Sequence, residues 1–336
     1  MPSALPARLR RRLMPARLLH AGVAGLAVPV LALAACAGSS GTTSTSSAGP
    51  AQASGPASGS SPAAASFPVS VAGANGPLTI SAQPHRIVSL SATETEILFA
   101  IGAGSQVVAV DDQSNYPKTA PTTTLSAYKP NAEAVAGYAP DLVVLSDDRN
   151  GIVGALGKLK IPTLMLTAPQ TLDDSYSQYT TLGSATGHPA EAAQEVQTVK
   201  ARIAAAVASV PKPAKPLRVY HELEQDYYSV TSTTFIGSIY RLFGLQDIAD
   251  SAKGAESGYP QLSAEYVVQA APDIIVLADT KCCGQTPGTL AKRPAFNTIP
   301  AVKDGRIVAA DDDIVSRWGP RTADFAELVA RELGGR

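Results

Sequence analysis

The sequence predicts an α/β protein of two similar lobes with mainly parallel sheets, joined by one long helix, with a ligand cleft between them. The first observation is a repeat: residues 131–145 (NAEAVAGYAPDLVVL) match residues 263–277 (SAEYVVQAAPDIIVL) at a constant offset. The second is a single long helix predicted over residues 190–210, with strand and helix patterns alternating on both sides of it. A unit that occurs only twice, far apart, favours two lobes rather than a solenoid.

Each copy of the repeat predicts the same three-part unit. A short amphipathic helix comes first, and an Ala-Pro-Asp break ends it because proline cannot extend a helix. The strands that follow, residues 142–145 and 274–277, are continuously apolar, as parallel strands buried on both faces usually are.

The N-terminal residues predict export and a lipid anchor. Residues 1–35 begin with several arginines and no acidic residue, then continue as an apolar run that ends in Leu-Ala-Ala before Cys36. This pattern is typical of a secretory signal peptide. The cysteine after small residues resembles the bacterial lipobox, in which the thiol is diacylated. We expect Cys36 to anchor the protein to the outer face of the cell membrane; an incidental cysteine in a plain signal peptide or membrane anchor is the alternative.

The segment after the signal peptide predicts a flexible tether. Residues 36–66 are almost wholly Ala, Gly, Ser, Thr and Pro without a charge, a composition that cannot bury a core. The ordered chain is then expected to consist of an N-terminal lobe at residues 67–189, the interlobe helix at 190–210 and a C-terminal lobe at 211–336.

The expected elements follow a strand–helix alternation in each lobe, which predicts parallel sheets covered on both faces. In the N-terminal lobe they are a strand at residues 85–90, a helix at 95–101, and strands at 107–110, 142–145 and 161–166. In the C-terminal lobe they are a strand at 217–220, a helix at 235–243, strands at 274–277 and about 306–308, and a closing helix at 322–333.

The interlobe helix has clear sequence boundaries. Pro189 stands at its start, where proline is well tolerated, and Pro211, Pro213 and Pro216 follow its end. The alanine-rich sequence between them is a strong helix former. We expect this helix to act as a rigid spacer rather than a hinge.

Charge and motif content exclude several function classes. The chain carries a net charge of −1 before the basic signal peptide is removed, so nothing indicates binding to nucleic acid. No Gly-x-Ser-x-Gly elbow, His-Glu-x-x-His pair or phosphate loop is present, and no catalytic residue is assigned. After the signal peptide, no apolar run is long enough to span a bilayer.

A set of colinear motifs then resembles a known family, from about Pro84 to the C-terminus. The motifs are Arg86-Ile87-Val88-Ser89-Leu90, Thr95-Glu96-Ile97-Leu98-Phe99-Ala100-Ile101-Gly102, Asn115-Tyr116-Pro117, both Ala-Pro-Asp copies, Phe235-Ile236-Gly237 and Ser316-Arg317-Trp318-Gly319-Pro320-Arg321. Together they resemble the cobalamin and iron-siderophore binding proteins of ATP-driven importers. The resemblance implies two lobes that change shape little on binding, and a monomer without a cofactor. It implies capture of a ferric siderophore or cobalamin and delivery to an ABC permease and its ATPase.

The resemblance also assigns a docking role to one glutamate in each lobe. By position these are Glu133 and Glu265, which would meet arginines of the permease and set orientation and on-rate. The alternative is purely local, because Asn131 and Ser263 are good N-caps and a glutamate in the first helical turn favours the helix dipole.

The ligand is expected beyond the carboxyl ends of the strands, where open α/β sheets bind their ligands. The loops expected there carry aromatic and basic side chains that suit a tetrapyrrole ring or an anionic ferric chelate, namely Tyr116, Tyr128, Tyr227, Tyr228, Arg317, Trp318 and Arg321. Packing of Tyr227 and Tyr228 on the lobe is the alternative for these two. Ala127 and Ser146 stand where the best-known cobalamin binder has tryptophan, which argues against cobalamin itself.

Cysteine and histidine content bears on redox and metal chemistry. Cys282 and Cys283 follow the second repeat strand, and we expect a vicinal disulfide that stiffens this loop; free thiols and a metal or redox site are the alternatives. No metal site is assigned, because His85, His188 and His221 are widely separated in sequence and His221 is expected to be an ordinary lobe residue. An exported tetrapyrrole- or metal-handling protein with chelatase-like activity is the alternative function.

Overall fold

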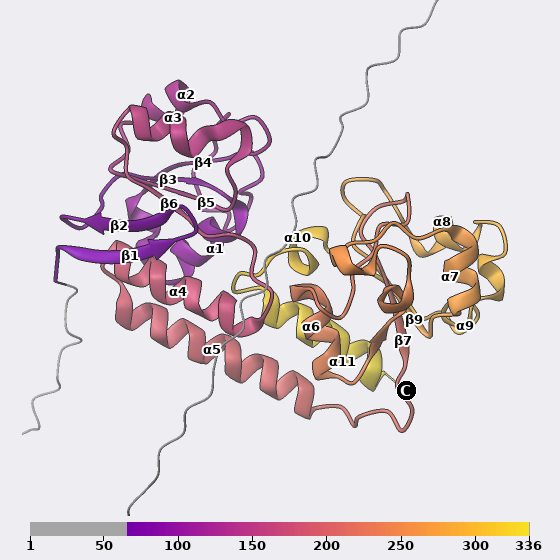
Figure 1. Cartoon of the computed structure of the whole chain (residues 1–336). Helices are drawn as coiled ribbons and strands as arrows, with labels where there is room; N and C mark the ends of the chain where they lie inside the picture. The colour runs from indigo at the N-terminus through magenta and orange to yellow at the C-terminus, as the bar shows by residue number, and fades with distance from the viewer. Residues whose placement is uncertain (1–65, 336) are drawn as a thin grey trace, which may run out of the picture. The chain divides into compact units, whose positions relative to one another are not determined.

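The computed structural model describes residues 66–335, which contain two four-stranded parallel sheets and one antiparallel hairpin (Figure 1). The predicted signal peptide, the lipidation site Cys36 and nearly all of the predicted tether lie outside the described residues. Within the described residues, no helix combines the length and apolar character needed to cross a bilayer.

The N-terminal lobe has strand order β4-β3-β5-β6, with every neighbouring pair parallel. The strands are β3 (Ile87–Leu90), β4 (Val107–Val110), β5 (Leu142–Leu145) and β6 (Thr163–Met165), and the helices are α1 (Ala92–Ala100), α2 (Ala132–Ala136), α3 (Ile152–Lys158) and α4 (Leu172–Thr186). Val88 and Val143 pack with the α2–α3 side, whereas Ile87 and Leu142 pack with the α1–α4 side. Because both faces are covered, these strands are apolar throughout, as the sequence predicts.

The C-terminal lobe repeats this arrangement with strand order β10-β9-β7-β8. The strands are β7 (Arg218–Glu222), β8 (Gln246–Asp247), β9 (Ile274–Leu277) and β10 (Ile307–Ala309), and the helices are α6 (Phe235–Leu242), α7 (Ala264–Ala270), α8 (Pro287–Ala291), α9 (Pro300–Lys303), α10 (Asp312–Val315) and α11 (Thr322–Gly334). Residues from α6 and α11 cover one face of this sheet, and residues from α7, α8 and α9 cover the other.

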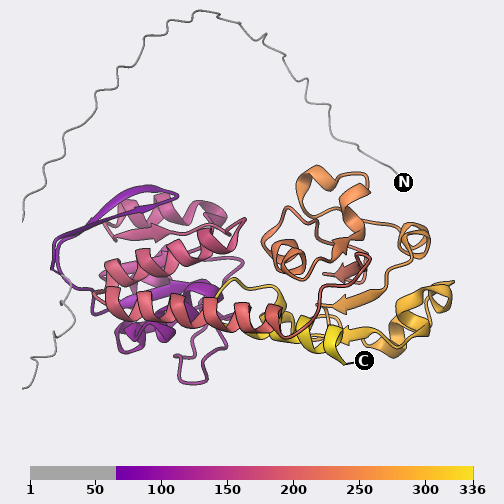
Figure 2. The same ribbon diagram turned by 90° about the horizontal axis from the view of Figure 1, so that it is seen from below.

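One helix, α5 (Pro189–Ala208), connects the lobes and begins with proline in its first turn, as predicted. It runs beside α4 of the first lobe and α11 of the second (Figure 2). Arg202 on α5 donates to Asp324 at 2.6 Å and to Glu327 at 2.8 Å, both on α11. These contacts join α5 to the C-terminal lobe; that the helix acts as a rigid spacer stays a prediction.

The two repeat copies have the same backbone geometry. Ala139 and Ala271, each before the shared proline, adopt positive φ values of 46° and 48°, which are uncommon for a residue with a side chain. Asp141 then accepts the backbone N–H of Arg86 at 2.9 Å, and Asp273 accepts that of Arg218 at 2.8 Å. The repeated aspartate therefore secures the beginning of the neighbouring strand.

Several elements have no counterpart in the sequence-based prediction: helices α3, α8, α9 and α10, strand β8 and, in the N-terminal lobe, a hairpin and a further helix. The hairpin of β1 (Val69–Gly73) and β2 (Gly76–Ile80) opens the N-terminal lobe, and α4 lies between β6 and α5. Tertiary packing stabilises both: the hairpin lies against β6 and α4, and α4 also packs along α5.

Candidate functional site

A cavity of about 650 Å³ lies between the two lobes and is lined by residues of both. Its N-terminal-lobe wall follows the carboxyl ends of β3, β4 and β5, including Ser91, Asp111 and Ser146. Its C-terminal-lobe wall includes Ala278, directly after β9, and Trp318. The cleft is thus placed where parallel sheets usually bind ligands, as the sequence predicts.

Two aromatic side chains, Tyr128 and Trp318, line this cleft. Tyr128 is 60% exposed, and the Arg149 guanidinium lies 5.2 Å from the centre of its ring. Trp318 is held in place, because its indole N–H donates to Gln178 at 2.9 Å and its carbonyl accepts from Ser175 at 2.7 Å. The cleft therefore offers one fixed and one accessible aromatic surface.

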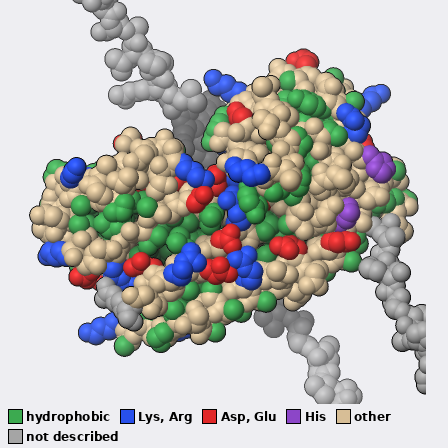
Figure 3. Space-filling view, turned by 180° about the vertical axis from the view of Figure 1, so that it is seen from behind, with side chains coloured by type: hydrophobic (Ala, Val, Ile, Leu, Met, Phe, Trp, Pro, Cys, Tyr) green, Lys and Arg blue, Asp and Glu red, His purple; other side chains and the backbone are tan. Residues whose placement is uncertain are grey.

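The cations that line the cleft are all paired with carboxylates. Arg149 contacts Asp147 at 2.7 Å, Lys281 contacts Asp313 at 2.8 Å, and Arg317 contacts Asp313 at 2.6 Å. On the face shown in Figure 3, basic and acidic side chains likewise lie next to one another in the central region. The paired charges leave little net positive field to attract an anion.

Arg317 and Arg321 also connect the lobes through one buried carboxylate. Glu96, on α1 of the first lobe, accepts from Arg317 at 2.8 Å and from Arg321 at 2.6 and 2.9 Å. The side chain of Glu96 has no exposed surface. This role of Glu96 was not predicted from the sequence, although a glutamate inside the apolar helix TEILFAI is a signal of a buried pair.

Two acidic groups of the N-terminal lobe have raised pKa values, one at the cleft wall and one in the lobe interior. Burial raises the pKa of Asp111, which lines the cleft, although its Oδ1 accepts from Ser114 at 2.9 Å and from the N–H of Gln113 at 3.0 Å. Burial also raises the pKa of Glu94, in the first turn of α1, to about 7. Glu94 is fully buried and does not line the cleft.

The structure brings three of the seven predicted ligand residues to the cleft, namely Tyr128, Arg317 and Trp318. Tyr116 and Arg321 instead line a separate cavity of about 460 Å³, where the Arg321 guanidinium lies 4.4 Å from the centre of the Tyr116 ring. Glu96 also lines this second cavity and holds Arg321 there, whereas Arg317 pairs with the same carboxylate from the lining of the cleft.

Tyr227 and Tyr228 are also absent from the cleft lining. Tyr227 packs on Phe296 and lies beneath the Arg293 guanidinium, 5.1 Å from its ring centre. Tyr228 forms an isolated bridge with Gln261 across two loops and is 39% exposed. Tyr227 therefore packs on its lobe, as the alternative interpretation predicts. Tyr228 lies at the lobe surface, at the end of a turn.

The paired glutamates occupy matching exposed positions. Glu133 lies in the first turn of α2 and Glu265 in the first turn of α7. Asn131 accepts the N–H of Ala134, and Ser263 accepts that of Tyr266, so both predicted caps are present. The N-caps that the local alternative invokes are therefore present, and both carboxylates are exposed. The docking role of the two glutamates stays a prediction.

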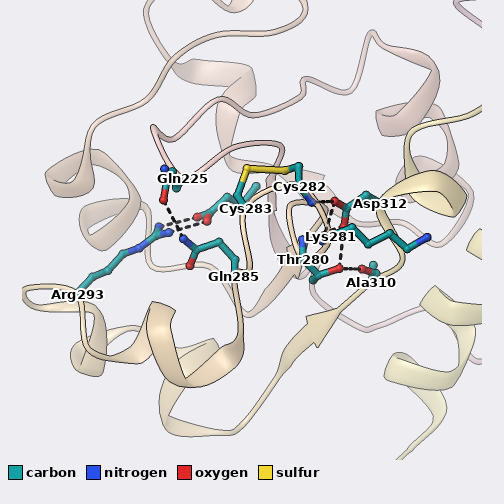
Figure 4. The surroundings of a disulfide bond; sticks show 10 residues. Gln225, Thr280, Lys281, Cys282, Cys283, Gln285, Arg293, Ala310 and Asp312 are labelled. Atoms are coloured by element: carbon teal, nitrogen blue, oxygen red, sulfur yellow. Dashed lines mark hydrogen bonds and ion pairs between the residues drawn. A yellow bond between two sulfur atoms is a disulfide. The ribbon is translucent and has the colours of Figure 1, made fainter. Parts of the chain in front are cut away.

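Cys282 and Cys283 are joined by a disulfide in the loop after β9 (Figure 4). Cys282 lines the cleft. The loop contacts Asp312 on one side, and on the other Gln285 donates to Gln225 at 3.4 Å.

The histidines do not converge on a metal site. His221 is buried with its Nδ1 2.7 Å from the Tyr240 hydroxyl, and burial lowers its pKa to about 3. His188 lies 3.9 Å from the exposed Glu191. Among residues 66–335, no group of three or more His, Cys, Asp or Glu side chains is arranged to hold a metal ion.

Comparisons with known proteins agree with this architecture. A cobalamin-binding protein of Halobacterium salinarum is 30% identical, over 75% of this chain and 70% of its own. An uncharacterized ABC transporter substrate-binding lipoprotein of Bacillus subtilis, YvrC, is 29% identical over 77% of this chain and 83% of its own. The periplasmic haem-binding protein RhuT of Roseiflexus superposes with a TM-score of 0.65 at 26% identity, covering 74% of this chain and 98% of that one. Residues 87–314 match the periplasmic binding protein family, and with two parallel-sheet lobes around a cleft, the chain belongs to that family.

Proposed function

We propose that this protein captures a corrinoid of the cobalamin class in the interlobe cleft and delivers it to an ABC importer, made of a permease and an ATPase. The charge balance of the cleft carries the choice of ligand, because every lysine and arginine that lines it is paired with a carboxylate. An anionic ferric siderophore needs guanidinium or ammonium groups that are free to pair with it. A corrinoid is bulky and mostly uncharged, and its ring suits contact with Tyr128 and Trp318. Ala127 and Ser146, which stand in place of the tryptophans of the best-known cobalamin binder, line the same cleft, so on this proposal Tyr128 and Trp318 supply the aromatic contact instead. The name of the halobacterial relative supports the same ligand class.

Ferric haem is the second candidate, favoured by one observation. The Tyr128 hydroxyl belongs to a side chain that is 60% exposed at the cleft, and a tyrosine phenolate can ligate ferric haem. The Roseiflexus neighbour is named for haem binding. Replacement of Tyr128 by phenylalanine separates the candidates: haem binding is lost if the phenolate is a ligand, whereas a corrinoid keeps the aromatic contact and its affinity.

The corrinoid proposal is tested by titrating the protein with cyanocobalamin while following the fluorescence of its only tryptophan, Trp318. We expect saturable quenching at submicromolar ligand, because the indole lines the cleft. Trp318→Phe abolishes the signal but not the folded state, and equilibrium dialysis of this variant measures the remaining affinity. A flat titration and no retention in dialysis, from folded protein, contradict the corrinoid proposal.

We further propose that the protein acts as a monomer without catalysis, in contrast to a chelatase-like enzyme. The ligand released by mild denaturation after prolonged incubation is expected to have its original visible spectrum and metal content. A changed spectrum or loss of cobalt supports the enzymatic alternative.

The proposed location is extracytoplasmic, with Cys36 lipidated and the lobes held close to the importer. Glu133 and Glu265 are proposed as the docking groups, one on each lobe. Their support is the matching position of the two carboxylates, both exposed at the first turn of the repeated helix. No partner role for nucleic acid is proposed.

A further inference from the structure

The C-terminal wall of the cleft offers few groups that are free to contact a ligand. Lys281 contacts Asp311 at 2.5 Å and Asp313 at 2.8 Å, and the Asp312 carboxylate accepts backbone N–H groups of its own lobe. Arg317 is paired within the interlobe ion pairs described above. Apart from these groups, the apolar residues of this part of the lining are Ala278, Trp318 and Cys282, which is one half of the Cys282–Cys283 disulfide.

The disulfide loop is fixed in place from beneath by a single carboxylate. Asp312, in the first turn of α10, accepts the N–H of Thr280 at 2.8 Å, of Lys281 at 2.9 Å and of Cys282 at 3.0 Å. The Thr280 hydroxyl also donates to Asp312 at 2.8 Å (Figure 4). A carboxylate that accepts several backbone donors holds a loop strongly, since such charge-assisted bonds are stronger than neutral ones.

The far side of the loop is closed as well. The N–H of Gln285 donates to the carbonyl of Asp279 at 3.2 Å, so the segment returns on itself around the two cysteines. Cys282 and Cys283 are exposed, and Cys282 lines the cavity. The sulfur atoms are thus presented at the surface of a secured loop, next to the cleft, and are not packed in the core.

We infer that the Cys282–Cys283 disulfide is an apolar contact surface for the bound chelate and determines part of its affinity and specificity. This inference rests on the proposed function, because it names a further ligand-contacting element of the same cleft. A disulfide has no hydrogen-bond donor, and the ring it closes between adjacent residues restricts the backbone. Contact with the flat face of a ring ligand therefore removes apolar surface from water without desolvating a polar group.

The inference is tested with two double variants that separate apolar contact from covalent closure. Cys282→Ala/Cys283→Ala keeps an apolar surface, whereas Cys282→Ser/Cys283→Ser presents two hydroxyl groups. We expect the serine pair to bind cyanocobalamin about tenfold more weakly than wild type, which corresponds to about 1.4 kcal/mol, and the alanine pair to lie between them. Thr286→Ser, at the end of the same segment but outside the cleft lining, serves as the control and is expected to keep wild-type affinity.

Reduction of the native protein provides a second measurement that needs no substitution. A dithiol reductant transfers two electrons to the disulfide, giving two thiols on the protein and the oxidised, cyclic disulfide of the reagent. Wild-type affinity is expected to fall on reduction, while the serine pair, which lacks the bond, is expected not to respond. Circular dichroism and thermal unfolding verify that each protein is folded.

The outcomes distinguish failure of the inference from failure of the proposed function. Wild-type affinity in the serine pair and in the reduced protein overturns the inference and leaves the corrinoid proposal standing. If the serine and alanine pairs lose the same affinity for cyanocobalamin, the disulfide does not act as an apolar contact surface. If wild type binds a ferric hydroxamate or haemin instead of cyanocobalamin, the corrinoid proposal fails and the same comparison is made with that chelate. Binding of none of the three by folded protein contradicts both proposals.

Discussion

Glu96 is the residue at which the lobes are most directly connected, because it is fully buried and accepts from both Arg317 and Arg321. Its replacement by glutamine leaves the mostly buried Arg321 guanidinium without its counter-charge and leaves Arg317 paired with Asp313 alone. Breaking a buried pair by removing one partner costs about 3–5 kcal/mol. We expect Glu96→Gln to lower the free energy of unfolding by that amount, measured by urea denaturation.

The matched control for Glu96 is Asp173→Asn. Asp173 is 92% exposed on its side chain and lies 3.9 Å from Lys200, so its charge is expected to contribute at most about 0.5 kcal/mol. A loss in Glu96→Gln no larger than in this control would show that the interlobe ion pair does not hold the lobes together.

Asp247 makes stability depend on pH. Burial raises its pKa to about 8, and neither of its carboxylate oxygens has a hydrogen-bond partner among residues 66–335. The folded protein therefore retains a proton that the unfolded chain has already released at neutral pH, so stability falls as pH rises. His221 opposes this slope near pH 6.5, because burial keeps it neutral in the folded protein whereas its ordinary pKa of 6.5 leaves about half of the unfolded chains protonated there; this contribution fades toward pH 8.

We expect Asp247 to contribute a decrease of about 1 kcal/mol per pH unit in the free energy of unfolding between pH 6.5 and 8, which Asp247→Asn removes. Glu94 and Asp279, each with a pKa of about 7, add to the decrease near the lower end of this range. Urea denaturation at several pH values provides the measurement. An unchanged slope in the variant would assign the pH dependence to other groups.

At the residue scale, sequence motifs located part of the site. Trp318 and Arg317 stand in a motif that the structure places at the cleft. The partner of Arg317, Glu96, lies 221 residues earlier in the chain, and local patterns carry no information about such a pairing. For the same reason the sequence could not show that Arg321 and Tyr116 meet in a different cavity.

At the scale of elements, the repeated helices α2 and α7 present Glu133 and Glu265 at equivalent positions. If these carboxylates dock on the importer, Glu133→Gln/Glu265→Gln is expected to reduce cellular cyanocobalamin uptake about tenfold while its affinity in dialysis is unchanged. Glu191→Gln, an exposed charge near the start of α5, is the control. Full uptake by the double variant would leave only a helix-terminal role for the two glutamates.

Elements with strong local signals were predictable and those held by packing were not. The buried strands β5 and β9 are apolar throughout, and prolines mark both ends of α5. The sequences of these elements are therefore sufficient to predict them. Helix α4 is rich in Ser, Thr and Asp, and it depends on a capping box between Thr171 and Asp174 and on its contacts with α5. The short β1–β2 hairpin similarly depends on the lobe beneath it, because isolated hairpins are marginal in water.

At the scale of the whole molecule, membrane attachment and ligand capture are separable. Cys36→Ser is expected to move the protein from the membrane fraction to the soluble extracytoplasmic fraction while its cyanocobalamin affinity is unchanged, since a diacyl anchor supplies the membrane affinity. Fractionation with immunoblotting gives the measurement. Continued membrane retention of the variant would contradict lipidation at Cys36.

The claim that a corrinoid occupies the cleft is tested most directly by crystals grown with cyanocobalamin and an anomalous difference map at the cobalt edge. We expect one cobalt peak inside the interlobe cavity, close to Tyr128, Trp318 and Cys282. A cobalt peak in the cavity lined by Tyr116 and Arg321, or on an outer surface, would contradict the account, as would crystals that exclude the ligand at saturating concentration.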